Sequence, residues 1–307
     1  MKHTVPEANS ATLTALVRTW AEVSNRKARE LIEAGGVRIG GRVCRDPVSR
    51  PQGGEVVEIA DAAPAGPRPR RAITGPGFRV LHQDRSLLVV DKAPGVVVVP
   101  TGKEDPDDLP LVARVAAALK LAGHRGDPLW VIHRIDRSTS GLVLMARNEK
   151  AAETLREQFH RREPRREYLA WVAGHPDPPF ARLECSLAED PHTHRVEVTP
   201  SPTLGRQAVL DYAVQATSDS PDGPAARVLV HLVTGRRNQV RALFSHFGWP
   251  LLGDGWYGGP KQAITRTALH AWRLEIVHPE TRQKELFTAP LPDDLTRLDR
   301  RLRLRQG

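Results

Sequence analysis

The sequence is poor in cysteine and has no long hydrophobic run. Its two cysteines, Cys44 and Cys185, stand far apart and lack metal-ligand spacing. Neither a disulfide framework nor a zinc site is therefore expected, and a reducing compartment fits. The N-terminal residues contain no apolar core of a signal peptide, and no apolar stretch approaches the length of a membrane span. We expect a cytoplasmic protein with no metal ion and no membrane partner.

Common ligand-binding motifs are missing as well. There is no G-x-G-x-x-G dinucleotide motif, no Walker-type phosphate loop and no G-x-S-x-G nucleophile elbow. Acidic residues are outnumbered, with 36 Asp and Glu against 45 Lys and Arg, which gives a formal net charge of +9. This excess is mostly arginine and favours a polyanionic partner such as nucleic acid, although basic residues on solvated faces would give the same total.

The chain is long enough for one large domain and one small domain. Residues 61–77 are rich in Pro, Gly and Arg and lack apolar periodicity, which predicts a linker. This linker would separate a small N-terminal domain, residues 10–60, from a large domain, residues 78–300.

The small domain is predicted to be a compact α/β module. Apolar residues from Leu13 to Trp20 repeat at helical spacing, and Ser24 is placed to cap a second helix. Short strands follow near residues 37–39 and 56–59, with a glycine turn at residues 40–41. This arrangement brings together a group of basic side chains, which are Arg26, Lys27, Arg29, Arg38 and Arg42.

The stretch S-N-R-K-A-R-E-L-I-E-A-G-G-V-R-I-G-G-R, which starts at Ser24, resembles the S4 RNA-binding domain. The pattern of that family is a helix with spaced basic residues followed by G-x-V-x-V-N-G, and Gly40 stands here where Asn is usual. The resemblance implies that Arg26, Arg29 and Arg38 contact RNA phosphates. Such contacts position an RNA without reading its sequence.

The large domain is predicted to contain more strands than helices. Apolar runs predict strands at 87–92, 96–99, 131–132, 141–145, 168–172, 208–214, 227–233 and 272–277. Amphipathic patterns predict helices near 111–119 and after Asn148, a residue that can cap a helix. Strands and helices alternate irregularly, so we expect an α+β fold with a mixed, mostly antiparallel sheet.

The segment His133–Gly141, H-R-I-D-R-S-T-S-G, is densely polar yet lies between two apolar runs. A loop of this kind at a sheet edge is exposed to ligand and held by a rigid frame. A hydrolytic triad of His133, Asp136 and Ser138 is disfavoured, because triad residues converge from separate segments. From the residues alone, the simplest interpretation is that Asp136 and Thr139 hydrogen-bond the turn.

Longer matches point to chemistry. The stretch H-R-I-D-R-S-T-S-G-L-V-L-M-A-R resembles the catalytic motif of the RluA family of pseudouridine synthases, commonly H-R-L-D-x-x-T-S-G-L-L-L-x-A-K. Three further segments resemble that family's motifs in the same order: V-V-D-K-A-P-G-V-V-V-V-P at 89–100, R-R-E-Y-L-A-W-V-A-G at 165–174 and T-G-R-R-N-Q-V-R at 234–241. The resemblance covers residues 80–295 and implies the pseudouridine synthase fold.

Three positions qualify the resemblance. His133 points to the RluA family, because the related RsuA family usually has Gly there. Asn238 and Leu243 stand where the RluA family usually has His. We expect Asn238 to affect local packing or RNA contact rather than the chemistry.

The resemblance implies a role for three residues. Asp136 would be the catalytic carboxylate, and Arg241 the cation that keeps it ionised in a pocket that excludes water. Tyr168 would stack on the extruded uracil, and its hydroxyl could assist removal of a proton from the ring. The reaction is an isomerisation, so no cofactor is needed. The sequence leaves open whether the carboxylate attacks the sugar, adds to the ring or acts as a base.

Two further arginines are predicted to bind RNA. Arg134 lies two residues before Asp136, so in an extended chain both side chains would project to one side. Arg134 would then fill the space left by the base or grip a phosphate, and Arg236 would hold the RNA backbone. Large-subunit ribosomal RNA is the expected substrate of a monomeric enzyme. The alternatives are transfer RNA as substrate, or a ribosome-assembly factor that binds RNA without chemistry.

Overall fold

The computed structural model describes residues 1–7, 11–60, 73–100, 102, 108–124, 128–201 and 203–306. Contacts within the chain divide it into two units. The first combines Met1–Ile73 with Leu274–Thr288, and the second combines Thr74–Arg273 with Ala289–Gly307. Most of the predicted linker, residues 61–72, lies outside the described residues, and a short strand, β5 (Thr74–Gly75), occupies its end. Residues 274–288 group with the first unit, although the sequence assigned them to the large domain.

The first unit packs two helices against short strands. Its elements are β1 (Lys2–Thr4), α1 (Leu13–Trp20), α2 (Asn25–Glu33), β2 (Val37–Ile39), β3 (Arg42–Cys44), β4 (Val56–Ile59) and β16 (Lys284–Thr288). The predicted cap is present, because the Ser24 hydroxyl accepts a hydrogen bond from the Lys27 amide at 3.2 Å. β16 pairs in parallel with β3, so a strand from near the end of the sequence completes this module.

An apolar core holds the two helices of the first unit against its strands. Leu13 and Val17 of α1 and Ala28 and Ile32 of α2 are almost fully buried. Their spacing of four residues places each pair on one helix face, which packs on Val57 and other apolar strand residues. Burial of the apolar face, rather than helix propensity, therefore holds these short helices in place.

The strands of the second unit form a mixed, mostly antiparallel sheet. They are β5, β6 (Phe78–Gln83), β7 (Leu87–Lys92), β8 (Trp130–Val131), β9 (Ser140–Ala146), β10 (Arg165–Ala173), β11 (Phe180–Glu189), β12 (Val196–Thr199), β13 (Arg206–Ser220), β14 (Gly223–Leu232), β15 (Leu269–Val277) and β17 (Arg305–Gln306). β9 runs parallel to β15, whereas β7–β9, β10–β14 and β13–β14 are antiparallel pairs. The predicted α+β architecture is confirmed.

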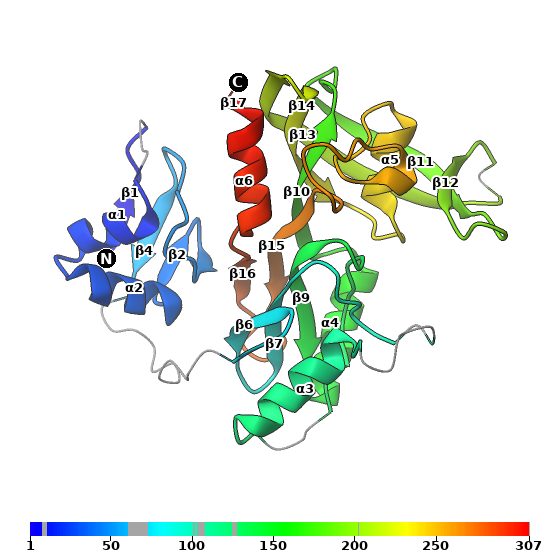
Figure 1. Ribbon diagram of the computed structural model, residues 1–307. Coiled ribbons are helices and arrows are strands. Elements are labelled where there is room, and N and C mark those ends of the chain that lie inside the picture. The colour runs from blue at the N-terminus through cyan, green and yellow to red at the C-terminus, as the bar shows by residue number, and fades with distance from the viewer. Residues whose placement is uncertain are drawn as a thin grey trace. The chain divides into compact units, whose positions relative to one another are not determined.

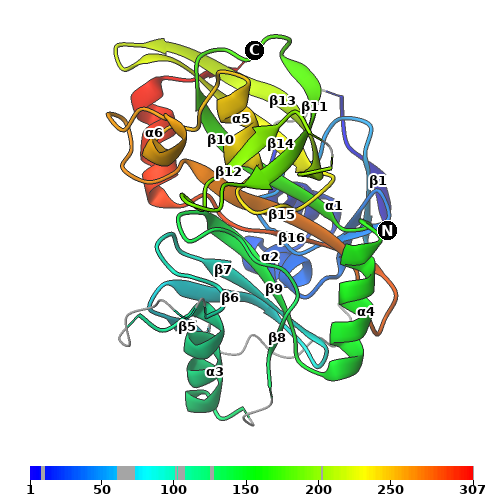
Figure 2. The same ribbon diagram turned by 90° about the vertical axis from the view of Figure 1, so that its right-hand side faces the viewer.

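Helices cover the two halves of this sheet. They are α3 (Leu111–Leu121), α4 (Glu149–His160), α5 (Gln239–His246), the short 3₁₀ helix η1 (Gly255–Tyr257) and α6 (Asp293–Leu302). In Figures 1 and 2, α3 and α4 lie beside the half formed by β6, β7 and β9, whereas α5 and α6 lie beside the half formed by β10, β13 and β14. No helix in the described ranges is long and apolar enough to cross a membrane.

One predicted strand is wrong. Residues 96–99 do not pair in the sheet. The carbonyl oxygens of Val97 and Val98 instead accept hydrogen bonds from the Leu111 and Val112 amides, at 2.8 and 3.2 Å. The backbone of this apolar run therefore caps the first turn of α3. The amides of that turn have no hydrogen-bond partner within the helix.

Candidate active site

The loop between β8 and β9 carries Asp136 on a rigid frame. The Thr139 amide donates to the Asp136 carbonyl at 3.1 Å and closes the turn. The Gly95 amide donates to the Arg137 carbonyl at 2.7 Å and ties the loop to the turn after β7. Ile135 is buried, so the loop also has an apolar anchor.

Lys92 lies beneath this loop and is fully buried. Its ammonium donates to the carbonyl oxygens of Ala93 and Arg137, at 2.9 and 3.2 Å. Burial lowers the pKa of Lys92 to about 7, although the nearby Asp136 carboxylate opposes this shift. Lys92 therefore joins two segments of the frame and adds positive charge behind Asp136.

The opposite wall comes from β10, the end of β14 and α5. Gln239, in the first turn of α5, holds the connecting loop: its side-chain oxygen accepts from the Thr234 hydroxyl at 2.8 Å and from the Arg236 amide at 2.9 Å. The side-chain amide of Gln239 donates to the Val209 carbonyl at 3.0 Å. The loop 234–238 is thus fixed to the sheet, with Arg236 bonded through Nε to the Gln207 carbonyl at 3.0 Å.

Arg241 of α5 lies at the centre of the site. Its Nη1 is 3.5 Å from Oδ2 of Asp136, and its Nε and Nη2 bind the two oxygens of Asp254 at 2.6 and 2.9 Å. Asn238 has a left-handed backbone (φ +51°), which Asn tolerates better than most residues, and its side-chain oxygen accepts from Nη1 of Arg241 at 3.0 Å. The guanidinium carbon also lies 4.8 Å from the centre of the Tyr257 ring. Asn238 therefore holds the arginine beside Asp136, rather than affecting only packing or RNA contact.

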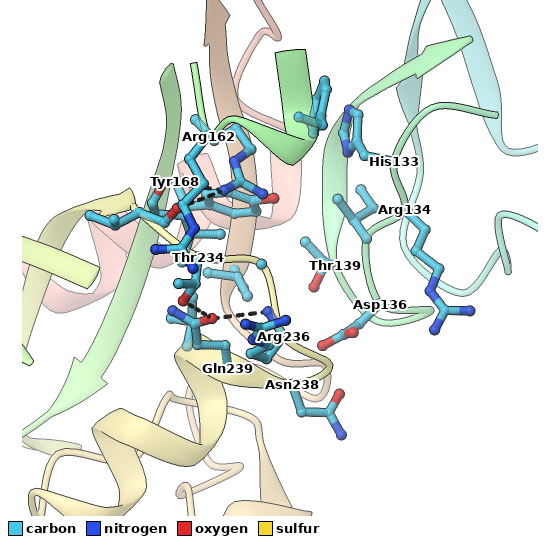
Figure 3. Close-up of a pocket in the computed structure, with 18 of the residues that line it drawn as sticks. His133, Arg134, Asp136, Thr139, Arg162, Tyr168, Thr234, Arg236, Asn238 and Gln239 are labelled. Carbon is cyan, nitrogen blue, oxygen red and sulfur yellow. Dashed lines mark hydrogen bonds between the residues drawn. The ribbon is translucent and has the colours of Figure 1, made fainter. Parts of the chain in front are cut away.

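These walls enclose a cavity of about 590 Å³. That volume is in the range of small-molecule sites and is large enough for a nucleotide. Figure 3 shows Asp136 and Arg134 on one side and Tyr168, Arg162 and Gln239 on the other. Among the lining residues that the structure describes, Asp136 is the only carboxylate, whereas the lining arginines are Arg134, Arg156, Arg162, Arg166, Arg236 and Arg241.

The electrostatics of Asp136 reflect opposing influences. Burial raises the pKa of Asp136 above its ordinary value of 3.8, and Arg241 lowers it. Asp254 raises the pKa again, and Lys92 lowers it. The carboxylate stays 26% exposed at the cavity, so it is accessible to a ligand while its charge is balanced by two cations.

Tyr168 is buried in β10, and burial raises its pKa to about 12. It is therefore a neutral phenol at physiological pH. His133 is also neutral, because burial lowers its pKa to about 3. Its Nε2 accepts from the Leu144 amide at 3.2 Å and its ring stacks on Phe159 at 5.2 Å, so His133 fastens the loop to β9 and α4.

The predicted residues of the large domain all line the cavity, but Arg134 is oriented differently from expectation. No strand is formed around it, and in Figure 3 its side chain extends to the far side of the loop from the Asp136 carboxylate. The expectation that the two side chains share one side is therefore wrong. Its exposed guanidinium stays available to RNA at the cavity mouth.

The basic residues predicted to bind RNA in the first unit differ in their partners. Arg26 is 91% exposed and lies 3.0 Å from Glu30 one turn along α2. Arg29 is exposed on the same helix. Arg38 instead donates to the Gly41 carbonyl at 3.1 Å and to Gln283 at 2.5 Å, so its guanidinium is already engaged.

An electropositive cavity with one carboxylate, together with a small basic module, is typical of enzymes that act on nucleic acids. The family described as RNA pseudouridylate synthase matches residues 86–246, and the S4 domain matches residues 16–57. The chain belongs to the RNA pseudouridylate synthase family, carries an S4 RNA-binding domain, and is an RNA pseudouridine synthase of the RluA type.

Named relatives support this assignment. The dual-specificity RNA pseudouridine synthase RluA of Escherichia coli O6:H1 is 33% identical over 221 residues, covering 70% of this chain and 94% of that protein. The ribosomal large subunit pseudouridine synthase D of Xanthomonas campestris is 31% identical over 314 residues, covering 94% of this chain and 87% of that protein. The solved structure of human RNA pseudouridylate synthase domain containing 4 shares the fold, with a TM-score of 0.62 and 22% identity over 74% of this chain and 94% of that chain.

The sequence missed two residues of this site. Asp254 follows a turn at Gly253 and reaches Arg241 because the loop folds back tightly, with a backbone approach that leaves no room for a side chain at Gly253 or Gly259. Arg162, at the end of α4, has only its charge as a signal in the sequence. In the described part of the chain, no group of three or more His, Cys, Asp or Glu could hold a metal ion.

Proposed function

We propose that this enzyme converts a uridine of large-subunit ribosomal RNA to pseudouridine, with Asp136 as the catalytic carboxylate. The observation that carries the proposal is the position of Asp136, which is the single carboxylate among the described residues that line the cavity and lies 3.5 Å from Arg241. In the reaction the glycosidic C–N bond breaks, a C–C bond forms to ring carbon five, and the proton on that carbon is lost while the ring nitrogen gains one. Atoms balance without an oxidant or a leaving group, so a nucleophile or base and proton transfers suffice.

The other lining residues fit supporting roles. Tyr168 offers an aromatic face that replaces part of the stacking lost by an extruded uracil, worth about 1–3 kcal/mol. Its neutral phenol suits hydrogen bonding better than proton abstraction as a phenolate. Arg241 keeps Asp136 ionised, and Arg134 and Arg236 at the cavity bind the RNA backbone. The geometry is compatible with attack on the sugar, addition to the ring and elimination.

The choice of ribosomal RNA is supported by the first unit. The relative from Xanthomonas campestris, whose name specifies the large ribosomal subunit, aligns with 94% of this chain. In the first unit, Arg26 and Arg29 of α2 would contact RNA phosphates. The positive charge of Arg38 would attract the RNA without a direct contact. A ribosomal substrate would place the enzyme in the cytoplasm. We further propose that it acts as a monomer, because the three proposed catalytic residues, Asp136, Tyr168 and Arg241, line one cavity within a single chain.

Mapping pseudouridine in total RNA tests the proposal. Cells that lack the gene are complemented with wild type, Asp136→Asn or an empty vector. We expect sites in large-subunit RNA to disappear in the deletion strain, to return with wild type and to stay absent with Asp136→Asn. Restoration by Asp136→Asn would refute the role of Asp136, and loss confined to transfer RNA would refute the substrate. A growth defect rescued by Asp136→Asn would favour an assembly role that depends on RNA binding alone.

A further inference from the structure

The end of α4 contains an arginine in a backbone conformation that favours glycine. The Arg162 amide donates to the Phe159 carbonyl at 3.2 Å and the Glu163 amide donates to the Gln158 carbonyl at 3.0 Å, which is the Schellman motif. The residue at the turn of this motif is left-handed, and Arg162 has a φ of +59°. A side chain is disfavoured there because of its Cβ.

Other helices of this chain show the usual solution. The same pair of turn hydrogen bonds ends α2, α3 and α5, with a glycine of positive φ at the turn: Gly35, Gly123 and Gly248. Glu22 after α1 and Arg303 after α6 are also left-handed residues with a side chain, and both are exposed. A residue with a side chain is therefore tolerated at this left-handed position. Glu22, Arg162 and Arg303 differ in the surroundings of their side chains.

Arg162 differs from its neighbours in what its side chain meets. Arg161 pairs with Glu157 at 2.6 Å, and Arg165 pairs with Glu167 at 2.7 Å. Arg162 lines the cavity and has no acidic partner among the described residues. In Figure 3 it lies on the Tyr168 side of the cavity, across from Asp136.

Two more arginines from nearby positions in the chain line the same cavity. Arg156, exposed on α4, lines the cavity and has no carboxylate partner among the described residues. Arg166 donates to the Leu232 and Val233 carbonyls at 3.4 and 3.3 Å. Burial lowers the pKa of Arg166, and the nearby charge of Arg162 lowers it further. Like charges gathered without a counter-charge are stabilised by a bound anion.

We propose that Arg162, with Arg156 and Arg166, forms a phosphodiester-binding subsite on the α4 wall of the cavity. It would hold the RNA backbone beside the uridine that enters, from the side opposite Asp136. The proposal rests on the assignment of this cavity as the uridine site. Arg162 contacts a phosphate that does not react, so its binding energy is the same before and during the chemical step and affects KM rather than kcat.

The test uses the full chain with Arg162→Gly, Arg162→Lys and the matched control Arg303→Gly. Binding of single-stranded decauridylate is measured against salt, and KM and kcat are measured on total RNA from cells that lack the gene. Glycine suits both left-handed turns, so both glycine variants should unfold at or above the wild-type temperature. Arg162→Gly should lower the slope of log affinity against log salt by about 0.7, the value for one lost contact to a single strand. It should also raise KM about tenfold at unchanged kcat.

The variants separate a phosphate site from the alternatives. Arg162→Lys should keep the wild-type salt slope, and Arg303→Gly should keep both the slope and KM. A wild-type slope and KM in Arg162→Gly would overturn the proposal, and so would an equal loss in Arg303→Gly, which would show only a general effect of net charge. Loss of thermal stability in Arg162→Gly would assign the residue a structural role instead. The assignment of Asp136 is tested separately by Asp136→Asn, so either idea can fail without the other.

Discussion

Arg241 makes its closer ion pair with Asp254 and not with Asp136. Both oxygens of Asp254 bind the guanidinium, at 2.6 and 2.9 Å, whereas Asp136 approaches it at 3.5 Å. Asp254 is 2% exposed, so it cannot exchange this partner for water. The buried carboxylate of Asp254 thus fixes Arg241, whose Nη1 points to the Asp136 carboxylate at the cavity.

Replacing Asp254 by Asn should destabilise the fold and shift the pH profile. Removing one partner of a buried pair leaves a charge uncompensated, which costs about 3–5 kcal/mol of unfolding free energy. Asp254 raises the pKa of Asp136, so its loss lowers that pKa. Denaturant unfolding should show the loss, and the acidic limb of activity should move to lower pH. An acidic limb that moves to higher pH would contradict this arrangement.

Replacing Arg241 by Gln should move the acidic limb of the pH–activity profile to higher pH, opposite to the shift expected for Asp254→Asn. Arg241 lowers the pKa of Asp136, so the carboxylate would hold its proton to higher pH once the cation is gone. The unfolding free energy should fall by about 3–5 kcal/mol, as in Asp254→Asn. Arg241→Lys is the control, because it keeps a charge but cannot bind Asp254 with two parallel hydrogen bonds. The acidic limb of activity should lie closer to its wild-type pH in Arg241→Lys than in Arg241→Gln.

Asp136→Asn should stabilise the protein at neutral pH. The pKa of Asp136 is raised in the folded state by burial, so the stability tied to this group is complete below the ordinary value of 3.8 and is lost as pH rises through the folded pKa. Asn does not ionise and avoids that loss. Thermal unfolding should show a higher midpoint for Asp136→Asn at pH 7 and a difference that shrinks toward pH 4. Equal midpoints throughout would mean that the carboxylate is fully compensated.

Lys92→Met should flatten the rise of stability with pH above neutrality. The folded pKa of Lys92 is lowered from 10.5 to about 7, so the unfolded chain binds more protons between these values and wild-type stability increases with pH there. The effect is on the order of a few kcal/mol for a fully buried lysine. Unfolding free energies measured at pH 7 and pH 9.5 should differ less in Lys92→Met than in wild type. The freed carbonyls of Ala93 and Arg137 should also loosen the loop that carries Asp136 and lower kcat.

Local features of the fold could be predicted from the sequence because their causes are local. Ser24 and Asn148 cap helices as expected, and the apolar run before Asp91 is a buried strand. The helix α6 was missed although Leu295, Leu298 and Leu302 repeat at helical spacing. The run 96–99 has the composition of a strand, and only the position of α3 decides that its carbonyls cap a helix.

Only those site residues that belong to recognisable sequence motifs could be predicted. Asp136, Tyr168 and Arg241 come from three separate segments, and resemblance to a family was needed to associate them. Asp254 could not be paired with Arg241, because the pairing depends on a loop that folds back through Gly253 and Gly259. Arg162 stands among arginines of equal charge, and only the turn after α4 directs it to the cavity.

β15 starts in the second unit at Leu269, but from Leu274 onward the chain groups with the first, where β16 pairs with β3. The first unit is therefore built from two separate stretches of the chain, and deleting residues 1–60 would remove only one of them. The deletion would remove β3, the strand with which β16 pairs in parallel. An exposed strand edge without a partner favours aggregation between copies of the protein.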